Sequence, residues 1–177
     1  MKKSKTLYLV RHAKSSWSDP SLSDLERPLN KRGERSAPEM AKRLLQHISQ
    51  EKDKFPEPEL IISSPALRAH VTAKILAKEL DFKAKNIKLD ERLYFQGAKK
   101  MLEVIYELGG NTESLMIVGH NPDISELHNL LNKNKIDRMP TCAVATLHFD
   151  TKKWPDIKNV SASLVDFDYP KKTLKIC

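Results

Sequence analysis

The pattern of apolar and polar positions predicts strands and helices that alternate over the first two thirds of the chain. Three short runs, at residues 6–10, 60–63 and 114–118, are rich in apolar and β-branched residues and are typical of buried strands. Each run is followed, directly or after a loop, by a segment in which apolar residues recur at helical spacing. This alternation predicts an α/β domain of three layers, with residues 6–10 as its first and central strand.

Capping residues predict where the helices begin and end. Asn30 is expected to cap the first helix, and Pro38 predicts that this helix begins later or kinks. Ser64, followed by Pro65, is expected to cap the second helix. The third helix should end at Gly109.

The last third of the chain has a different pattern. Residues 143–149 and 160–167 look like strands with turn-rich flanks and no helix between them, which predicts an antiparallel pair at one side of the sheet. Residues 86–89 form a weaker candidate strand. No composition shift suggests a linker, so we expect a single domain over residues 1–177.

Basic side chains follow all three buried strands. Arg11 and His12 end the first run, Arg68 lies a few residues after the second, and His120 follows the third. Ligands of open α/β sheets bind at the carboxyl ends of the strands, so these side chains should converge if the strands are neighbours. Any one of them could be an ordinary surface or turn residue, but their repetition at equivalent places favours a shared site.

The residue types suit a phosphoryl group. An arginine offers a planar fork to phosphoryl oxygens, and a neutral histidine can attack phosphorus through a ring nitrogen. The chain has no glycine-rich Walker loop and no carboxylate cluster for a metal. We therefore predict a phosphate site without a metal or any other cofactor.

Composition limits the classes of ligand and the location that are expected for this protein. The net charge of +8 favours anionic ligands, but the basic residues are scattered and are not interleaved with aromatic residues, so nucleic acid is not expected. No apolar run is long enough for a membrane span, and the basic start lacks a secretory signal core. Cys142 and Cys177 suggest neither a disulfide framework nor a zinc site, which favours the cytoplasm.

Three motifs resemble those of the histidine phosphatase (phosphoglycerate mutase-like) superfamily: LVRHAKS at 9–15, SPALRAHVTA at 64–73 and VGHNP at 118–122. The short chain, and DLERPL at 24–29 leading into Arg32 and Gly33, resemble its SixA-type phosphohistidine phosphatase branch. The resemblance implies a mixed, mostly parallel sheet between helix layers.

The resemblance also implies roles for individual residues. His12 would be the nucleophile that forms a phosphohistidine intermediate, and Arg11, Arg68 and His120 would hold the phosphoryl oxygens. Ser15, in the same loop, is a further candidate for substrate binding.

Two features of the motif region differ from the family or leave a role open. Most members carry Gly and Glu after the Arg-His pair, where this chain has Ala13 and Lys14, which makes a mutase less expected. The acid that protonates the leaving group is open, with Glu91 the first candidate and Asp24 the second.

We therefore predict a metal-independent phosphatase that acts on a phosphorylated substrate, with a phosphohistidine-bearing protein as the leading hypothesis. A general small-molecule or sugar-phosphate phosphomonoesterase is the enzymatic alternative. A non-catalytic phosphate-binding module is the alternative from another class. The sequence does not indicate an oligomeric state.

Overall fold

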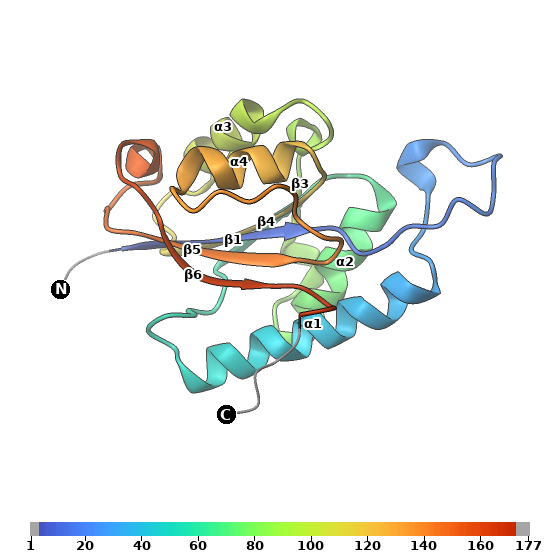
Figure 1. Cartoon of the computed structure of the whole chain (residues 1–177), viewed down its shortest axis with the longest axis horizontal. Coiled ribbons are helices and arrows are strands. Elements are labelled where there is room, and N and C mark those ends of the chain that lie inside the picture. Colours follow the sequence, from blue (N-terminus) through green and yellow to red (C-terminus); the bar gives the residue numbers. More distant parts are fainter. Residues whose placement is uncertain (1–3, 173–177) are drawn as a thin grey trace.

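The computed structural model of the chain describes residues 4–172. Its centre is one sheet of six strands in the order β3-β2-β4-β1-β5-β6 (Figure 1). The strands are β1 (Lys5–Arg11), β2 (Leu60–Ser63), β3 (Lys88–Leu89), β4 (Ser114–Gly119), β5 (Val144–Phe149) and β6 (Ser163–Asp168). The helices are α1 (Lys31–Gln50), α2 (Leu67–Glu79), α3 (Ala98–Leu108) and α4 (Asp123–Leu131). Short 3-10 turns are η1 (Asp24–Glu26), η2 (Ala84–Asn86), η3 (Glu91–Leu93) and η4 (Trp154–Asn159).

The sheet is mixed and mostly parallel, as predicted. β4 pairs in parallel with both β1 and β2, and β2 pairs in parallel with β3. β5 is antiparallel to β1 and to β6, which confirms the antiparallel pair at one side. Because β1, β4 and β2 are parallel neighbours, their carboxyl ends lie at the same edge of the sheet.

Alternating side chains of β1 separate two cores. Leu7 and Leu9 pack into the core that includes residues of α3 and α4, whereas Tyr8 and Val10 pack into the core that includes residues of α1 and α2. The two pairs of helices therefore cover opposite faces of the sheet (Figure 1). This arrangement is the predicted three-layer architecture.

Two local predictions about where helices begin were wrong. α1 begins at Lys31, directly after its cap Asn30, and continues through Pro38. Its buried face outweighs the roughly 3 kcal/mol that an interior proline costs. The second helix begins only at Leu67, with Ala66 at the cap position, and the Ser64 hydroxyl accepts from the Ala66 amide at 3.2 Å and also contacts His120.

The connection between β5 and β6 also differs from the prediction of a link without a helix. The 3-10 turn η4 lies there and buries Trp154 and Ile157 against the α3 and α4 side of the sheet. Between residues 4 and 172, no helix has both the length and the apolar character needed to cross a bilayer.

Candidate active site

The carboxyl ends of β1, β2 and β4 meet at a cavity of about 350 Å³. Arg11, His12, Arg68 and His120 all line it, so the structure brings together the four residues that follow the predicted strands. Backbone hydrogen bonds tie the strand ends together, since the amide of His12 donates to the Gly119 carbonyl at 3.1 Å. The predicted convergence is therefore present.

The ring of His12 is held in one tautomer. Its Nδ1 atom lies 2.7 Å from the carbonyl oxygen of Ala13, which can only accept a hydrogen bond. The hydrogen of the neutral ring is thus on Nδ1, and Nε2 keeps its lone pair. Burial, together with the guanidiniums of Arg68 and Arg11, outweighs the Ala13 carbonyl and lowers the pKa of His12 to about 3. At neutral pH the ring has the uncharged form that a nucleophile needs.

His120 lies beside His12, with their ring centroids 5.0 Å apart. Its Nε2 is 2.8 Å from the hydroxyl oxygen of Ser64, the residue that follows β2. Burial lowers the pKa of His120 to about 2, and the nearby His12 and Arg68 contribute in the same direction. Both imidazoles are therefore neutral at neutral pH.

Two arginines, the buried Arg68 and the half-buried Arg11, supply positive charge. Arg11 donates from Nη1 to the Met139 carbonyl at 2.9 Å, and Arg68 donates from Nη2 to a carboxylate oxygen of Asp24, also at 2.9 Å. Burial and the charge of Arg138 lower the pKa of Arg11 to about 10, which leaves it charged at neutral pH.

Three buried nitrogens of these residues have no hydrogen-bond partner within the described part of the chain: Nε of Arg11, Nε of Arg68 and Nδ1 of His120. A buried polar atom without a partner is costly, and one way to satisfy it is a ligand. A tetrahedral oxyanion fits this set of groups, because the guanidiniums donate hydrogen bonds and bring positive charge.

Comparison with known proteins identifies the family. The model of the histidine phosphatase superfamily (branch 1) matches residues 7–94. A chloroplastic protein of Arabidopsis thaliana is 31% identical over 161 residues, which cover 86% of this chain and 70% of that protein. The chain belongs to the histidine phosphatase superfamily. It is therefore a phosphatase.

Solved structures with the same fold include SixA proteins. A protein assigned as the phosphohistidine phosphatase SixA of Agrobacterium tumefaciens has a TM-score of 0.74 and 26% identity, over 94% of this chain and 98% of that chain. The protein histidine phosphatase SixA complexed with tungstate has a TM-score of 0.73 and 20% identity, over 93% and 97% of the two chains. A mycobacterial glucosyl-3-phosphoglycerate phosphatase has a TM-score of 0.65 and 16% identity, over 91% and 97%.

Asp24 lies at the centre of a hydrogen-bond network that the sequence motifs did not reveal. Its Oδ1 accepts from Arg27 at 3.0 Å, and its Oδ2 accepts from Arg68 at 2.9 Å and from the Tyr94 hydroxyl at 2.5 Å. Partial burial alone would raise the pKa of Asp24, but the bonds from Tyr94, Arg68 and Arg27 lower it to about 2. Asp24 is therefore ionised at neutral pH.

Arg27 is a third arginine of the cavity that sequence reasoning missed. It is buried, and its Nη1 donates to the hydroxyl of Ser15 at 2.6 Å. Its position follows from the loop between β1 and α1, which cannot be deduced from periodicity. The available signal was the segment DLERPL, in which the spacing of three residues allows Asp24 and Arg27 to pair within one short turn.

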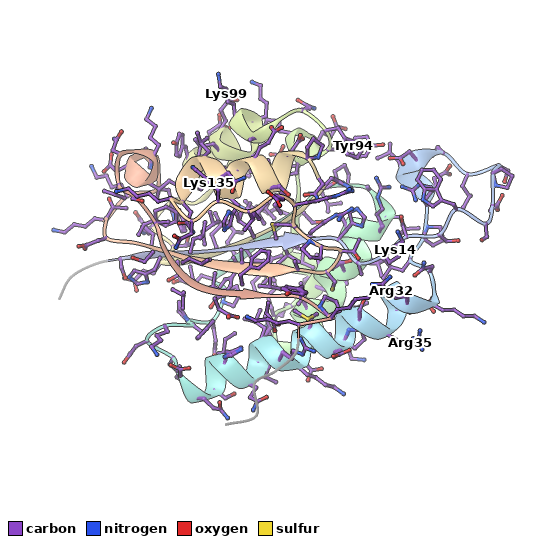
Figure 2. The ribbon with its side chains drawn as sticks, viewed as in Figure 1. Lys14, Arg32, Arg35, Tyr94, Lys99 and Lys135 are labelled. Atoms are coloured by element: carbon purple, nitrogen blue, oxygen red, sulfur yellow. The ribbon has the colours of Figure 1, made fainter. Side chains whose placement is uncertain are left out.

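The remaining predicted residues divide into two groups. Ser15 lines the cavity, with its hydroxyl already bonded to Arg27. Lys14 is exposed at the cavity, near the start of α1 where Arg32 and Arg35 lie (Figure 2). Glu91 is exposed and is not among the described residues that line the cavity.

A close backbone contact fixes the loop to α1. A Cβ atom on Gly33 would lie 2.2 Å from the carbonyl oxygen of Lys14, so only glycine fits at this position. The same carbonyl accepts from the amide of Asn30 at 2.9 Å. The loop that carries Ser15 and Asp24 therefore starts from a rigid point.

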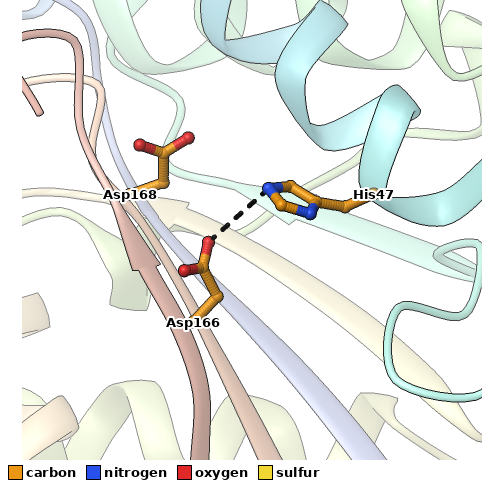
Figure 3. A group of neighbouring side chains, drawn as sticks. All are labelled: His47, Asp166 and Asp168. Atoms are coloured by element: carbon orange, nitrogen blue, oxygen red, sulfur yellow. Dashed lines mark ion pairs between the residues drawn. The ribbon is translucent and has the colours of Figure 1, made fainter. Parts of the chain in front are cut away.

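A separate cluster of metal-ligand residue types lies between α1 and β6. His47, Asp166 and Asp168 have ligand atoms within 4.8 Å of one another, and Nε2 of His47 is 4.0 Å from Asp166 (Figure 3). Both carboxylates already pair with cations, since Asp168 accepts from Arg43 at 3.1 Å and Asp166 lies 3.4 Å from Lys172. This cluster shares no residue with the cavity at the strand ends, and its contacts are those of a partly buried ion-pair network.

Proposed function

We propose that this phosphatase hydrolyses phosphohistidine carried by a protein, in the cytoplasm, through a covalent intermediate on His12. The observation that carries the proposal is the state of the two candidate acids. Asp24 is ionised by its bonds to two arginines and a tyrosine, and Glu91 does not line the cavity among the described residues. As a carboxylate, Asp24 carries no proton for a leaving group, and Glu91 is not placed at the cavity to supply one.

The lack of a donor favours one class of substrate. An alkyl phosphate must expel an alkoxide, and general acid catalysis of such a step is typically worth 10²-fold or more. A phosphohistidine whose ring is protonated expels a neutral imidazole, which needs no further proton. The cavity therefore suits a phosphorus–nitrogen bond better than an alkyl phosphate ester.

The first chemical step would occur at Nε2 of His12. Its lone pair attacks phosphorus, a new nitrogen–phosphorus bond forms, and the electrons of the breaking bond return to the substrate ring. Arg11, Arg68 and His120 would stabilise the phosphoryl oxygens in the transition state, with Arg27 adding positive charge.

In the second step, water attacks the phosphorus of the intermediate. The bond to His12 breaks, inorganic phosphate leaves, and Nε2 regains its lone pair. The sum is hydrolysis of one phosphoryl group with one water, and no cofactor takes part.

The structural similarity to SixA supports the proposal, since one of these proteins is described as a protein histidine phosphatase. The similarity to a glucosyl-3-phosphoglycerate phosphatase shows that the fold also serves sugar-phosphate substrates. The choice between them therefore depends on the leaving group and can be measured directly.

The deciding experiment compares phosphohistidine substrates with alkyl phosphates. We expect kcat/KM for a phosphohistidine-bearing phosphotransfer domain, and for free phosphohistidine, to exceed that for phosphoserine and glucose 6-phosphate by at least about 10²-fold. Equal or higher values for the alkyl phosphates would overturn the proposal.

The covalent step has its own test. Denaturation in alkali during turnover should trap a phosphoryl group on His12 that mass spectrometry detects and that mild acid removes. His12→Ala should remove both the adduct and turnover, by roughly 10³-fold or more, while the circular dichroism spectrum stays that of the wild type. Near-normal turnover in the folded variant would exclude His12 as the nucleophile.

A further inference from the structure

Two of the residues that line the cavity have large, exposed aromatic side chains. Trp17 and Phe95 are 73% and 49% exposed, and they come from the loop after β1 and the turn after η3. The other large exposed apolar residues of the described chain, Leu25, Leu67, Leu89 and Leu130, are not among those that line it. Aromatic side chains gain stability by burial, so a pair left open at a cavity indicates a ligand contact.

Trp17 is held in place by a cation–π contact. Its indole ring lies over the guanidinium of Arg27, whose central carbon is 3.5 Å from the ring centroid. Arg27 is in turn fixed by Asp24 and Ser15. One face of the indole is thus fixed against Arg27, while most of the indole surface remains open to a ligand.

Phe95 is held in a conformation that aromatic residues rarely adopt. Its φ of +52° lies in the left-handed region, which costs a residue with a Cβ on the order of 1–3 kcal/mol. The ring packs on His120, with centroids 4.7 Å apart and planes inclined by 36°. The backbone strain therefore places an aromatic ring beside the imidazole that lies next to His12.

We propose that Trp17 and Phe95 form a subsite for the ring of the leaving group, the imidazolium of phosphohistidine. This inference rests on the proposed function. A protonated ring would be repelled by the positive charges of Arg11, Arg27 and Arg68, and the faces of aromatic rings attract such a cation without competing for the phosphoryl group. When the bond to phosphorus breaks, its electron pair neutralises the ring, and the attraction weakens as the imidazole leaves.

The test compares two substrates that share a phosphorus–nitrogen bond. Free phosphohistidine has a ring, whereas phosphoramidate releases ammonia and has none. In Trp17→Leu and Phe95→Leu, which keep an apolar side chain but lose the ring, we expect the ratio of kcat/KM for phosphohistidine to kcat/KM for phosphoramidate to fall about tenfold each. Leu130→Ala, at a side chain that is 57% exposed on α4, should keep the wild-type ratio.

Other outcomes would overturn the subsite. An unchanged ratio, whether both substrates lose activity or neither does, would show that the rings do not contact the leaving group. A loss confined to a phosphohistidine-bearing protein, with free phosphohistidine unaffected, would make the two residues a protein-docking surface instead. Failure of the proposed function is detected separately, with the wild-type protein alone. If the wild type hydrolyses phosphoramidate but not phosphohistidine, both the proposed function and the subsite are wrong.

Discussion

The Nε2 atom of His120 lies 2.8 Å from the hydroxyl oxygen of Ser64, across the ends of two neighbouring strands. Ser64 follows β2, His120 follows β4, and the amide of Ser64 also donates to the Val118 carbonyl at 3.0 Å. With Nε2 engaged, the unpartnered Nδ1 is the ring nitrogen left for a phosphoryl oxygen. The serine thus orients the histidine without contacting the reacting group.

Ser64→Ala should therefore weaken catalysis without unfolding the protein. Loss of one hydrogen bond to a buried ring is worth about 1 kcal/mol, which predicts a fall in kcat/KM of roughly fivefold to tenfold. Steady-state kinetics with phosphohistidine measure this effect. Ser36→Ala removes another buried serine hydroxyl, on α1 and away from the cavity lining, and should leave kcat/KM near the wild-type value. Equal kinetics in the two variants would contradict the orienting role.

The convergence of the three strand ends could be predicted because it depends on pattern and topology. Apolar runs of strand length, each followed directly or within a few residues by Arg or His, define the buried strands, and parallel neighbours place their ends at one edge. The same reasoning located the antiparallel pair. Local periodicity and the geometry of α/β sheets are enough for these features.

The loop residues could not be predicted in this way. Asp24, Arg27 and Trp17 reach the cavity through a segment that has neither helical nor strand periodicity, and its path depends on tertiary contacts with Arg68 and Tyr94. The contact of the Ser64 hydroxyl with His120, a residue 56 positions away, could not be predicted either, although the same hydroxyl also accepts locally from the Ala66 amide. Rules based only on neighbouring residues in the sequence cannot predict side chains whose contacts are long-range.

Asp24→Asn separates a positioning role from an acid role. The amide keeps one acceptor oxygen but loses the charge that holds Arg27 and Arg68. Because these arginines act on the phosphoryl group of every substrate, we expect kcat/KM for phosphohistidine and for phosphoserine to fall together, by roughly tenfold. Parallel assays of the two substrates give the answer. A loss confined to phosphoserine would identify Asp24 as the proton donor.

Glu91→Gln tests the remaining candidate acid. The side chain is exposed and is absent from the described lining of the cavity, so we expect kcat/KM to change by less than about twofold for both phosphohistidine and phosphoserine. Glu107→Gln, at another carboxylate outside the cavity lining, serves as the control. A selective loss of about 10²-fold on phosphoserine would return Glu91 to the acid role.

Oxyanions that mimic the transferred group should compete with substrate. Guanidiniums and two imidazoles line the cavity, and within the described chain the buried Nε atoms of Arg11 and Arg68 are unpartnered donors. We expect tungstate and vanadate to raise the apparent KM without changing kcat, and activity to persist in excess chelator. Activity that disappears with chelator and returns with magnesium or zinc would contradict a mechanism without a metal.

Acid should destabilise the folded protein through the two cavity histidines. Burial lowers the pKa of His12 to about 3 and that of His120 to about 2, whereas both titrate near 6.5 in the unfolded chain. Between pH 6.5 and about 3 the unfolded state binds more protons, so the free energy of unfolding falls as the pH falls. Between pH 7.5 and pH 5.5, each histidine should remove about 1.4 kcal/mol.

The variant His12→Asn isolates one of these contributions, because asparagine does not titrate. Urea unfolding of the wild type and of His12→Asn at both pH values should show a smaller loss of unfolding free energy in acid for the variant, by about 1.4 kcal/mol. The comparison is made within each protein, so any stability that the substitution itself adds or removes at pH 7.5 cancels. An equal acid loss in the two proteins would mean that His12 already binds its proton in the folded state at pH 5.5. In that case the uncharged form assigned to His12 would be wrong over the same pH range.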